Sequence, residues 1–299
     1  MNIKPIKKLI IPAAGWGTRF LPMTKVVHKE LVPVLNRPLV DLLVDEAVLS
    51  GIEEIIIIIS ERKHNLIDYF EVNHELQAEL IQKNKLSLLQ EVKKTNRSHL
   101  ITKIVQTEQL GLGHALMCAK QYIGNEPFAV ILGDDLIKSK VPAIKQLIDF
   151  YYQSNGANIL GVQEVETKNI NKYGIVKPKN ESEKNLNAFE IETAIEKPEA
   201  KDAPSNKAIL GRYVFNPEIL EVFSTLKIKK NKEMQVVDAF DILKDKYKQK
   251  IFAFNFEGIR YDLGSMEGFV KANIDYALEN DEIRDEILDF IVKKIEFKK

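Results

Sequence analysis

The feature that most constrains the fold is a run of five consecutive isoleucines, Ile55–Ile59. The run has no polar residue at alternate positions, so a strand formed from it must be buried on both faces. Other short apolar runs lie at residues 9–14, 102–106 and 128–132, and helix-like segments separate them at 38–50, 63–82 and 112–122. Strands and helices in this order predict an α/β fold, with a Rossmann-like, mostly parallel central sheet flanked by helices.

The second half of the chain differs, because β-branched or alternating stretches follow one another closely. Strands are expected at 158–165, 174–176, 188–195, 208–215 and 251–255, and helices at 235–248 and 266–280. The polar residues 177–187 are typical of a surface hairpin. We therefore expect one domain over residues 1–280. Its halves, 1–156 and a smaller, β-rich 157–280, share one sheet and have a cleft between them.

The last segment, residues 281–299, is expected to form an amphipathic helix. Ile283, Ile287, Ile291 and Ile295 recur every four residues, which places them on one helix face. We expect this apolar face to pack on the helix's own domain. The alternative is a contact with a second copy of the chain.

Composition excludes several classes of protein. Lys and Arg together number 43, as do Asp and Glu, so no net basic field attracts nucleic acid or an anionic membrane. The single cysteine, Cys118, excludes an internal disulfide and a Cys-rich zinc site and fits a reducing compartment. The isoleucine run is far shorter than the roughly 20 apolar residues of a membrane span, and Pro12 interrupts a start that is similar to a signal peptide. We expect a soluble cytoplasmic protein with no nucleic-acid partner and no membrane span.

The first candidate site is the loop at residues 13–25, which follows the first apolar run. Open parallel sheets bind ligands at the carboxyl ends of their strands. Gly15 and Gly17 let backbone N–H groups face a phosphate, and Arg19 and Lys25 add positive charge. The loop is neither a Walker A motif nor the dinucleotide fingerprint, whose third glycine is replaced by phenylalanine here. A bare Gly-x-Gly is more often a structural turn, but the added threonine and two cations favour a phosphate site.

Further motifs follow in a fixed order. They are Gly15-Trp16-Gly17-Thr18-Arg19-Phe20-Leu21-Pro22, Lys29-Glu30-Leu31-Val32-Pro33, Gln106 before Gly111-Leu112-Gly113-His114-Ala115, Leu132-Gly133-Asp134-Asp135, Glu196-Lys197-Pro198, Ala203-Pro204-Ser205-Asn206, Gly211-Arg212-Tyr213, and Tyr261-Asp262 before Gly264-Ser265. From residue 9 to about residue 280, the chain resembles the sugar-phosphate nucleotidyltransferase family, in particular its bacterial uridylyl-transferring branch. His28 stands where that family usually has proline, and residues 231–238 replace a stretch that usually opens with paired glycines.

The resemblance implies an enzyme that transfers uridylyl from UTP to α-D-glucose 1-phosphate, giving UDP-glucose and pyrophosphate. It also implies Mg²⁺ as cofactor, a homodimer or homotetramer, a nucleotide-binding half at 1–156 and a sugar-binding half at 157–280. Two alternatives stay open. One is transfer of thymidylyl or another nucleotidyl group to glucose 1-phosphate, and the other is a noncatalytic nucleotide-sugar sensor.

This chemistry needs counter-charges rather than a nucleophilic side chain. The attacking phosphate oxygen is already anionic at neutral pH, because the second phosphate pKa is about 6. Two unit charges 4 Å apart repel by about 4 kcal/mol at an effective dielectric near 20. The resemblance implies that Arg19 cradles the β- and γ-phosphates, that Lys25 lies on the α-phosphoryl group, and that Asp134 and Asp262 hold Mg²⁺. Without the resemblance, the Gly-Asp-Asp sequence at 133–135 is as often a loop cap as a metal site.

The resemblance implies two further groups of contacts. Nucleotide-binding residues are expected to be Ala13, Ala14, Gly15, Gly17, Thr18, Glu30, Gln106, Gly111 and Asp135. Sugar-phosphate-binding residues are expected to be His114, Gly174, Glu196, Lys197 and Gly211. The amide of Gln106 matches the donor and acceptor edge of uracil, and the Glu196 carboxylate can accept from sugar hydroxyls. On their own, Glu196 and Lys197 are typical of a solvated strand end, and His114 is typical of a structural residue at a helix start.

Overall fold

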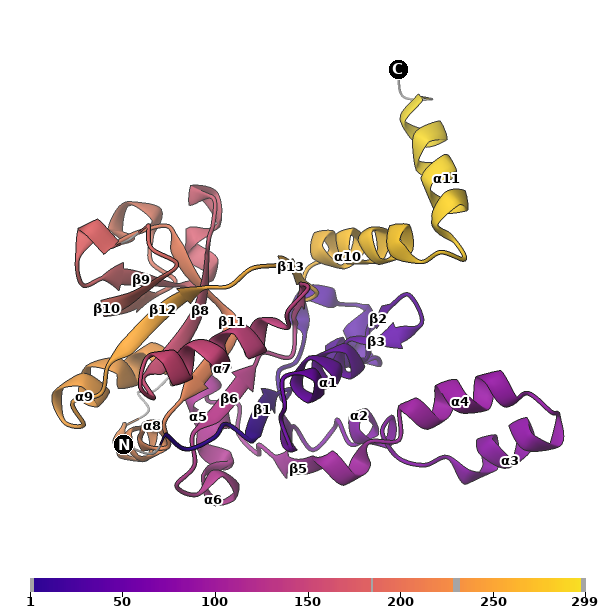
Figure 1. Ribbon diagram of the computed structural model, residues 1–299, viewed down its shortest axis with the longest axis horizontal. Coiled ribbons are helices and arrows are strands. Elements are labelled where there is room, and N and C mark those ends of the chain that lie inside the picture. The colour runs from indigo at the N-terminus through magenta and orange to yellow at the C-terminus, as the bar shows by residue number, and fades with distance from the viewer. Residues whose placement is uncertain (1–2, 184, 228–231, 297–299) are drawn as a thin grey trace.

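The computed structural model of the chain describes residues 3–183, 185–227 and 232–296 (Figure 1). The main sheet is built from nine strands: β1 (Lys8–Pro12), β4 (Glu54–Ile59), β5 (Ile101–Val105), β6 (Phe128–Ile131), β8 (Asn158–Glu164), β9 (Gly174–Pro178), β10 (Ala188–Glu196), β11 (Lys207–Phe215) and β12 (Ile251–Asn255). They lie in the order β5-β4-β1-β6-β11-β8-β12-β10-β9. Strands from both halves of the chain therefore form one continuous sheet.

The four strands from the first half pair parallel with one another, as their alternation with helices predicted. Strand β11 then pairs antiparallel with both β6 and β8. Among the described strands of the second half, β8 and β12 pair parallel, and β10 pairs antiparallel with both β9 and β12. The α/β fold with a β-rich second half is confirmed.

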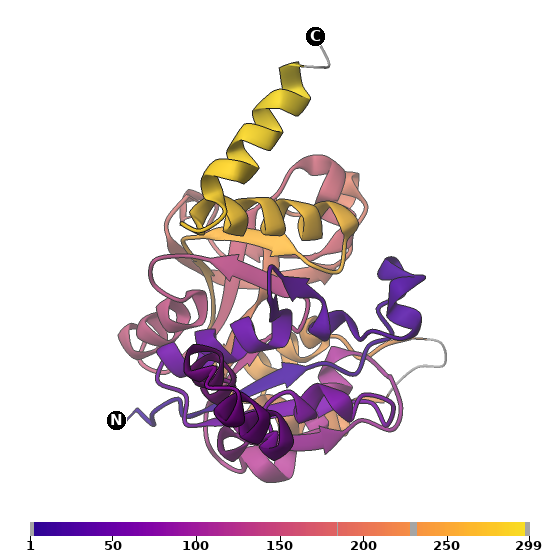
Figure 2. The same ribbon diagram turned by 90° about the vertical axis from the view of Figure 1, so that its right-hand side faces the viewer.

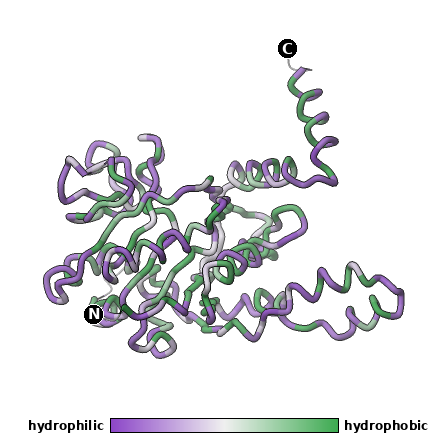
Figure 3. The backbone as a smooth tube through the Cα atoms, in the orientation of Figure 1, coloured by the Kyte–Doolittle hydropathy of each residue, from purple (hydrophilic) through white to green (hydrophobic). Residues whose placement is uncertain are grey.

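The five isoleucines belong to β4, between the edge strand β5 and β1, and divide between the two faces of the sheet. Ile55, Ile57 and Ile59 belong to one core, covered by α1 (Leu39–Leu49) and α7 (Ala143–Gln153). Ile56 and Ile58 belong to the other core, covered by α5 (Leu112–Cys118), α6 (Lys120–Ile123), α8 (Glu218–Thr225) and α9 (Phe240–Asp245). All five are fully buried, as a strand without polar alternation requires. Figure 3 shows the corresponding hydrophobic colouring along the central strands.

The helix predicted over residues 63–82 is wrong as one element. It consists of α2 (Asn65–Asp68) and α3 (His74–Gln82), and α4 (Leu86–Lys94) follows. The Asn73 side chain accepts a hydrogen bond from the backbone N–H of Leu76 at 2.9 Å, and this N-cap starts a new helix. Helices α3 and α4 form a hairpin that extends from the body of the molecule (Figure 1).

Other predicted helices are shorter or interrupted. The segment 112–122 is divided between α5 and α6, with Ala119 between them. The segment 235–248 forms the 3₁₀ helix η8 (Val236–Ala239) and α9, and the next predicted helix is α10 (Met266–Glu279). Further 3₁₀ helices are η1 (Thr18–Phe20), η2 (Met23–Lys25), η3 (Lys29–Leu31), η4 (Ser98–Leu100), η5 (Thr167–Lys172), η6 (Glu181–Glu183) and η7 (Ala200–Asp202).

Two small antiparallel ribbons complete the described structure. One joins β2 (Pro33–Val34) to β3 (Arg37–Pro38), and the other joins β7 (Asp135–Lys138) to β13 (Ile259–Asp262). Neither ribbon was expected, because each strand is too short to give a periodic pattern. The β7–β13 ribbon places Asp262 directly opposite Asp135, although the two lie far apart in sequence.

The C-terminal helix α11 (Arg284–Glu296) does not pack as predicted. None of its residues is buried, and it points away from the body of the molecule (Figure 1, Figure 2). Of the expected apolar face, Ile283, Ile287 and Ile291 are half-buried and Ile295 is exposed. The expected apolar face thus contacts α10 of its own domain but is not buried in the core. Among the described residues, no helix combines the length and apolar character that crossing a membrane requires.

A buried ion pair connects the two halves beneath the sheet edge that carries the candidate site. Arg212, on β11, is completely buried and forms two hydrogen bonds with Glu46 of α1, at 2.8 and 2.7 Å. The same guanidinium donates to the backbone carbonyl of Asp135 at 2.9 Å. Glu46 also accepts from the backbone N–H of Ile144 on α7 at 3.0 Å. One charge pair thus joins α1, α7, β7 and β11.

Replacing Glu46 with glutamine should lower the free energy of unfolding by about 3–5 kcal/mol, because the Arg212 guanidinium is then buried without its counter-charge. Urea unfolding at neutral pH measures the change. Glu53→Gln is the matched control, since Glu53 pairs with Lys7 at 3.0 Å on the surface. Loss of that exposed pair should cost less than about 1 kcal/mol. Equal effects of the two substitutions would contradict the structural role of Glu46.

Candidate active site

The candidate site lies at the carboxyl ends of the parallel strands, where two pockets open side by side. We call the first the acidic pocket, with a cavity of about 380 Å³. It is lined by Arg19, Lys29, Leu112, Leu132, Asp134, Asp135, Lys172, Tyr173, Gly174, Glu196, Lys197, Ile209, Tyr213, Glu233, Gln235, Val236, Val237, Arg260 and Asp262. We call the second the loop pocket, about 580 Å³. It is lined by Ala14, Gly15, Trp16, Thr24, Lys25, Val26, His28, Ser60, Glu61, Arg62, Lys63, Asn65, Gln106, Thr107 and Gln109.

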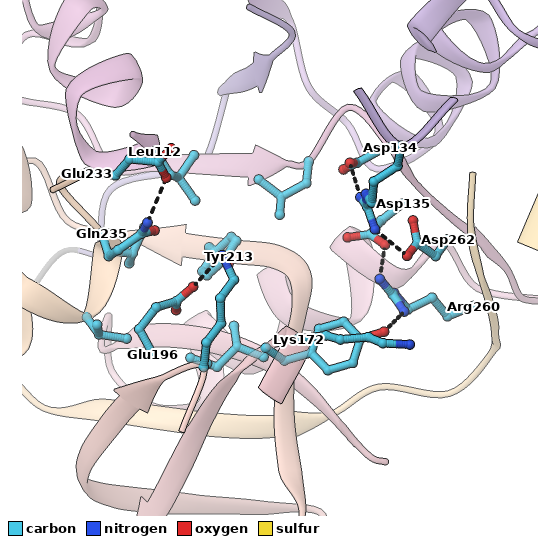
Figure 4. Close-up of a pocket in the computed structure, with 18 of the residues that line it drawn as sticks. Leu112, Asp134, Asp135, Lys172, Glu196, Tyr213, Glu233, Gln235, Arg260 and Asp262 are labelled. Atoms are coloured by element: carbon cyan, nitrogen blue, oxygen red, sulfur yellow. Dashed lines mark hydrogen bonds and ion pairs between the residues drawn. The ribbon is translucent and has the colours of Figure 1, made fainter. Parts of the chain in front are cut away.

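Two predicted metal carboxylates meet in the acidic pocket. The Arg19 guanidinium reaches Asp262 through Nη1 at 3.0 Å and Asp134 through Nη2 at 3.2 Å. The Lys29 ammonium donates to the same Asp134 oxygen at 3.0 Å. Figure 4 shows Asp134, Asp135 and Asp262 together on one side of the pocket and Glu196, Glu233 and Gln235 on the other. Side chains from distant parts of the chain therefore converge on one small volume.

The surroundings of this cluster shift the pKa values of Asp134 and Asp135 in opposite directions. Burial alone would raise the pKa of Asp134, but Lys29 and Arg19 outweigh burial and lower the pKa to about 2. Burial also opposes the charge of Lys29, yet Asp134 and Glu30 raise the pKa of the Lys29 ammonium. At Asp135 burial prevails over Arg260 and raises the pKa of the carboxyl group. Asp134 and Lys29 are thus held as an ion pair across the neutral pH range.

A second buried ion pair supports the glycine loop from below. The Lys63 ammonium donates to both oxygens of Glu30, at 3.0 and 2.8 Å, and to the carbonyl of Ala13 at 2.6 Å. Glu30 is fully buried, and burial lowers the pKa of Lys63 although Glu30 opposes this shift. The pair fixes the chain where it leaves β1, so Glu30 supports the loop from within the protein.

The loop pocket contains the residues expected to meet a nucleotide base. Gln106 follows β5, and its side-chain nitrogen lies 2.9 Å from Nδ1 of His114. Gln109 donates to the carbonyl of Ala14 at 2.8 Å, which ties the two walls together. His28 also lines this pocket, and burial, followed by the charge of Lys63, lowers the pKa of its imidazole. The walls of this pocket therefore carry the side-chain amides of Gln106 and Gln109, which can donate and accept hydrogen bonds.

The opposite wall of the acidic pocket is formed by the β9–β10 hairpin. Gly174 pairs with Glu196 across the two strands, and a Cβ at Gly174 would lie 3.0 Å from a Glu196 carboxylate oxygen. The Lys197 ammonium lies 3.4 Å from Glu196, and Lys197 itself adopts a positive φ of 47°. Burial raises the pKa of Glu196 although Lys197 opposes this. Because residue 174 is glycine, there is room for the Glu196 carboxylate beside it.

The structure places the expected site residues in three groups. Those that line the acidic pocket are Arg19, Asp134, Asp135, Gly174, Glu196, Lys197 and Asp262. Those that line the loop pocket are Ala14, Gly15, Lys25 and Gln106. Those that line neither are Ala13, Gly17, Thr18, Glu30, Gly111, His114 and Gly211. The space beside Gly111 is filled by the backbone of Met234, since a Cβ there would lie 2.6 Å from the Met234 carbonyl oxygen. The ligand contacts expected of all these residues stay predictions.

Sequence reasoning assigned no role to Lys29 and Arg260, two cations of the acidic pocket. Lys29 belongs to the Lys-Glu-Leu-Val-Pro motif, and its position in that motif could have indicated a site residue. A Cβ built on Gly15 would lie 3.9 Å from the Lys29 ammonium, which therefore lies between the two pockets. Arg260 lies on the unpredicted strand β13 and carried no sequence signal. Position 231, where the chain departs from the family pattern, lies outside the described residues.

The donor set fits a divalent cation such as Mg²⁺. Asp134 and Asp262 both accept from one guanidinium, so their oxygens face a common point. Mg²⁺ takes oxygen ligands and commonly uses one or two carboxylates together with substrate phosphates and water. Among residues 3–183, 185–227 and 232–296, no group of three or more His, Cys, Asp or Glu side chains could hold a metal. Asp134 and Asp262 thus present a pair of carboxylates that face one point, as such an ion requires.

A glycine loop beside cations, with two convergent aspartates and a second polar wall, fits the class of proteins that bind a phosphorylated nucleotide next to another ligand. The nucleotidyl transferase family matches residues 8–279, and the chain belongs to this family. It is 46% identical over 286 residues to UTP–glucose-1-phosphate uridylyltransferase 1 of Staphylococcus saprophyticus, covering 96% of this chain and 98% of that protein.

Solved structures agree with this relationship. The UTP-bound UDP-glucose pyrophosphorylase of Acinetobacter baumannii is 35% identical, with a TM-score of 0.85 over 96% of this chain and 99% of that one. A UDP-glucose pyrophosphorylase complexed with UDP-glucose is 37% identical, with a TM-score of 0.80 over 92% of this chain and 100% of that one. The fold and the family are therefore shown along nearly the whole chain.

Gly211→Ala should destabilise the protein by more than the about 1 kcal/mol that a positive φ costs a non-glycine residue. Gly211 has a φ of 65° at an irregularity in β11, and an added methyl group would overlap the Asp135 carboxylate. Urea unfolding measures the loss. Gly51→Ala is the control, because Gly51 has a φ of 84° but nothing within 4 Å of its added Cβ. A loss at Gly211 no larger than at Gly51 would contradict the crowding argument.

Proposed function

We propose that this chain catalyses transfer of uridylyl from UTP to α-D-glucose 1-phosphate, giving UDP-glucose and pyrophosphate. The observation that carries this proposal is the convergence of Arg19, Lys29, Asp134 and Asp262 beside the glycine loop. Relatives named for this activity match the chain over nearly its full length. Solved relatives that bind UTP or UDP-glucose support the same assignment.

In the proposed reaction a phosphate oxygen of glucose 1-phosphate attacks the α-phosphorus of UTP. The new P–O bond forms as the bond to the bridging oxygen breaks and pyrophosphate leaves. The protein's task is to offset anion–anion repulsion and to stabilise charge on the leaving group. Arg19 would bind the β- and γ-phosphates with the backbone of residues 15–18, and Lys25 and Lys29 would approach the α-phosphoryl group from the two pockets.

Asp134 and Asp262 would hold the divalent cation, which we propose to be Mg²⁺. When bound, that ion neutralises phosphate charge. The uracil base would lie in the loop pocket against Ala13 and Ala14. The Gln106 amide would form hydrogen bonds with the edge of the base. Glu196 and Lys197 would meet the hydroxyls and phosphate of the sugar phosphate in the acidic pocket.

We also propose a homo-oligomer in the cytoplasm. The apolar residues that α11 leaves exposed include Phe290 and Ile295, each 57% exposed. No residue of α11 is buried, and this supports the second alternative, a contact with another copy of the chain. The division into a nucleotide-binding half at 1–156 and a sugar-binding half at 157–280 is likewise a proposal.

The proposed function is tested by incubating the protein with glucose 1-phosphate, Mg²⁺ and each of several nucleoside triphosphates, and measuring pyrophosphate and nucleotide sugar. UTP should give UDP-glucose, and omission of Mg²⁺ or addition of a chelator should abolish the product. If dTTP outcompetes UTP more than about tenfold, which corresponds to about 1.4 kcal/mol of transition-state preference, the uridylyl assignment fails. Absence of pyrophosphate release with every triphosphate would instead favour a noncatalytic sensor.

Lys25→Ala and Lys29→Ala should each lower kcat at least about 100-fold, because each removes a positive charge from the proposed site of phosphoryl transfer. Steady-state assays with saturating UTP and glucose 1-phosphate measure this, and circular dichroism checks that the variants fold. Lys103→Ala is the control, since Lys103 is exposed on β5, outside both pockets. Turnover like that of the unmodified protein in either variant would remove that lysine from the mechanism.

A further inference from the structure

Strand β13 carries a cation that the proposed mechanism does not use. Arg260 and Asp262 are two residues apart on this strand, so their side chains lie on the same face of the ribbon. Asp262 is directly opposite Asp135 of β7, whereas Arg260 is opposite Ile137 and hence diagonal to Asp135. Diagonal positions are within reach of long side chains. The ribbon therefore brings two carboxylates and one guanidinium onto one face.

The Arg260 guanidinium offsets the repulsion between the carboxylates of Asp135 and Asp262. Like charges directly opposite each other in a β-ladder repel, which is the situation of Asp135 and Asp262. Nη2 of Arg260 forms an ion pair with the Asp135 carboxylate, and the two side chains are only 14% and 6% exposed. Because little water screens this pair, its charges affect one another and their neighbours strongly. Figure 4 shows Arg260 beside Asp135 and Asp262 in the wall of the acidic pocket.

Arg260 is also fixed from the opposite side of the pocket. Its Nη1 donates to the Tyr173 hydroxyl at 3.0 Å, and its guanidinium carbon lies 5.0 Å from the centre of the Tyr173 ring. Tyr173 immediately precedes Gly174, the first residue of β9. A planar guanidinium can stack on a ring while its N–H groups donate to other partners, whereas an ammonium has no plane that could stack. Arg260 thus links Asp135 to the hairpin that carries Glu196.

We propose that Arg260 is a positioning residue that sets the charge of the metal site by acting on Asp135. It pairs with Asp135 and keeps that carboxylate from binding the divalent cation. Asp134 and Asp262 are then the two carboxylates that bind the cation. The pocket then keeps enough positive charge to admit the phosphate of the sugar. This inference rests on the proposed function, since it assumes that a divalent cation and a phosphate meet in the acidic pocket.

Removal of the Arg260 charge has opposite consequences for the two ligands. The negative charge of Asp135 would then be uncompensated beside Asp134 and Asp262, and a divalent cation held by those two should bind more tightly. An anionic phosphate would meet an additional uncompensated negative charge, and it should bind more weakly. If Arg260 had only a structural role, its loss would weaken the binding of both the cation and the phosphate. An increase in metal affinity therefore indicates the electrostatic role, and a decrease indicates the structural one.

The experiment measures Mn²⁺ binding to the nucleotide-free protein by the loss of the free-ion electron paramagnetic resonance signal. Arg260→Gln should bind Mn²⁺ at least about tenfold more tightly than the unmodified protein, the direction that Coulomb's law gives for a lost nearby cation. In steady-state assays with Mg²⁺ the same variant should show a KM for glucose 1-phosphate raised at least about tenfold. Thermal unfolding checks that each variant is folded.

Three further variants keep the result decisive. Arg260→Lys keeps the charge and should leave Mn²⁺ affinity within about threefold of the original. Asp135→Asn combined with Arg260→Gln removes both charges of the pair and should restore the original Mn²⁺ affinity, even if Arg260→Gln alone does not fold. Arg37→Gln is the control for loss of an arginine elsewhere, because Arg37 pairs with Asp41 and Asp45 of α1, outside both pockets. It should leave Mn²⁺ affinity unchanged.

Unchanged or weaker Mn²⁺ binding by folded Arg260→Gln would overturn the role assigned to Arg260. A double variant that binds Mn²⁺ with altered affinity would do the same, because the pair would then not act through Asp135. If the unmodified protein transfers no uridylyl group but Arg260→Gln still tightens Mn²⁺ binding, the proposed function fails and the assignment of Arg260 to the charge of this site is supported.

Discussion

The structure depends on a balance of charge at the carboxyl edge of the parallel strands. Three carboxylates, Asp134, Asp135 and Asp262, face three cations, Arg19, Lys29 and Arg260, with separations of 3.0 to 3.2 Å in the pairs that Arg19 and Lys29 form. Charges of one sign could not be gathered in a partly buried pocket, because repulsion between them grows as water is excluded. The converging strands bring these six side chains together. The attraction between opposite charges offsets the repulsion between like charges.

Two deeper ion pairs hold this edge in place. Arg212 and Glu46 join β11 to α1 and also fix the backbone of Asp135, while Lys63 and Glu30 fix the carbonyl of Ala13 at the end of β1. The four side chains of these pairs are buried, so each charge depends on its partner inside the protein. Motifs that sequence reasoning linked to ligands thus also contain residues whose contacts lie within the protein.

The sequence predicted the parallel half of the sheet because its signal is local: five isoleucines without polar alternation require burial on both faces. It failed where contacts between distant segments decide the structure. The β7–β13 ribbon has four residues in each strand and no periodic pattern, so neither it nor Arg260 could be foreseen. Asp134 and Asp262 were paired only through the resemblance to a family, since no spacing in the chain indicates that they meet. The apolar face of α11 indicated a helix correctly, but an amphipathic pattern does not specify which surface the helix covers.

The formal charges of the acidic cluster cancel when no ligand is bound, and this has a consequence under the proposed function. Arg19 spans Asp134 and Asp262, the two carboxylates that would hold the divalent cation. A polyphosphate that takes the guanidinium of Arg19 leaves those carboxylates without their counter-charge. A divalent cation arriving with the polyphosphate neutralises both, so the two ligands complement each other in this site. Under the proposed function, the guanidinium that pairs with both aspartates would therefore be the group that makes nucleotide and metal binding mutually favourable.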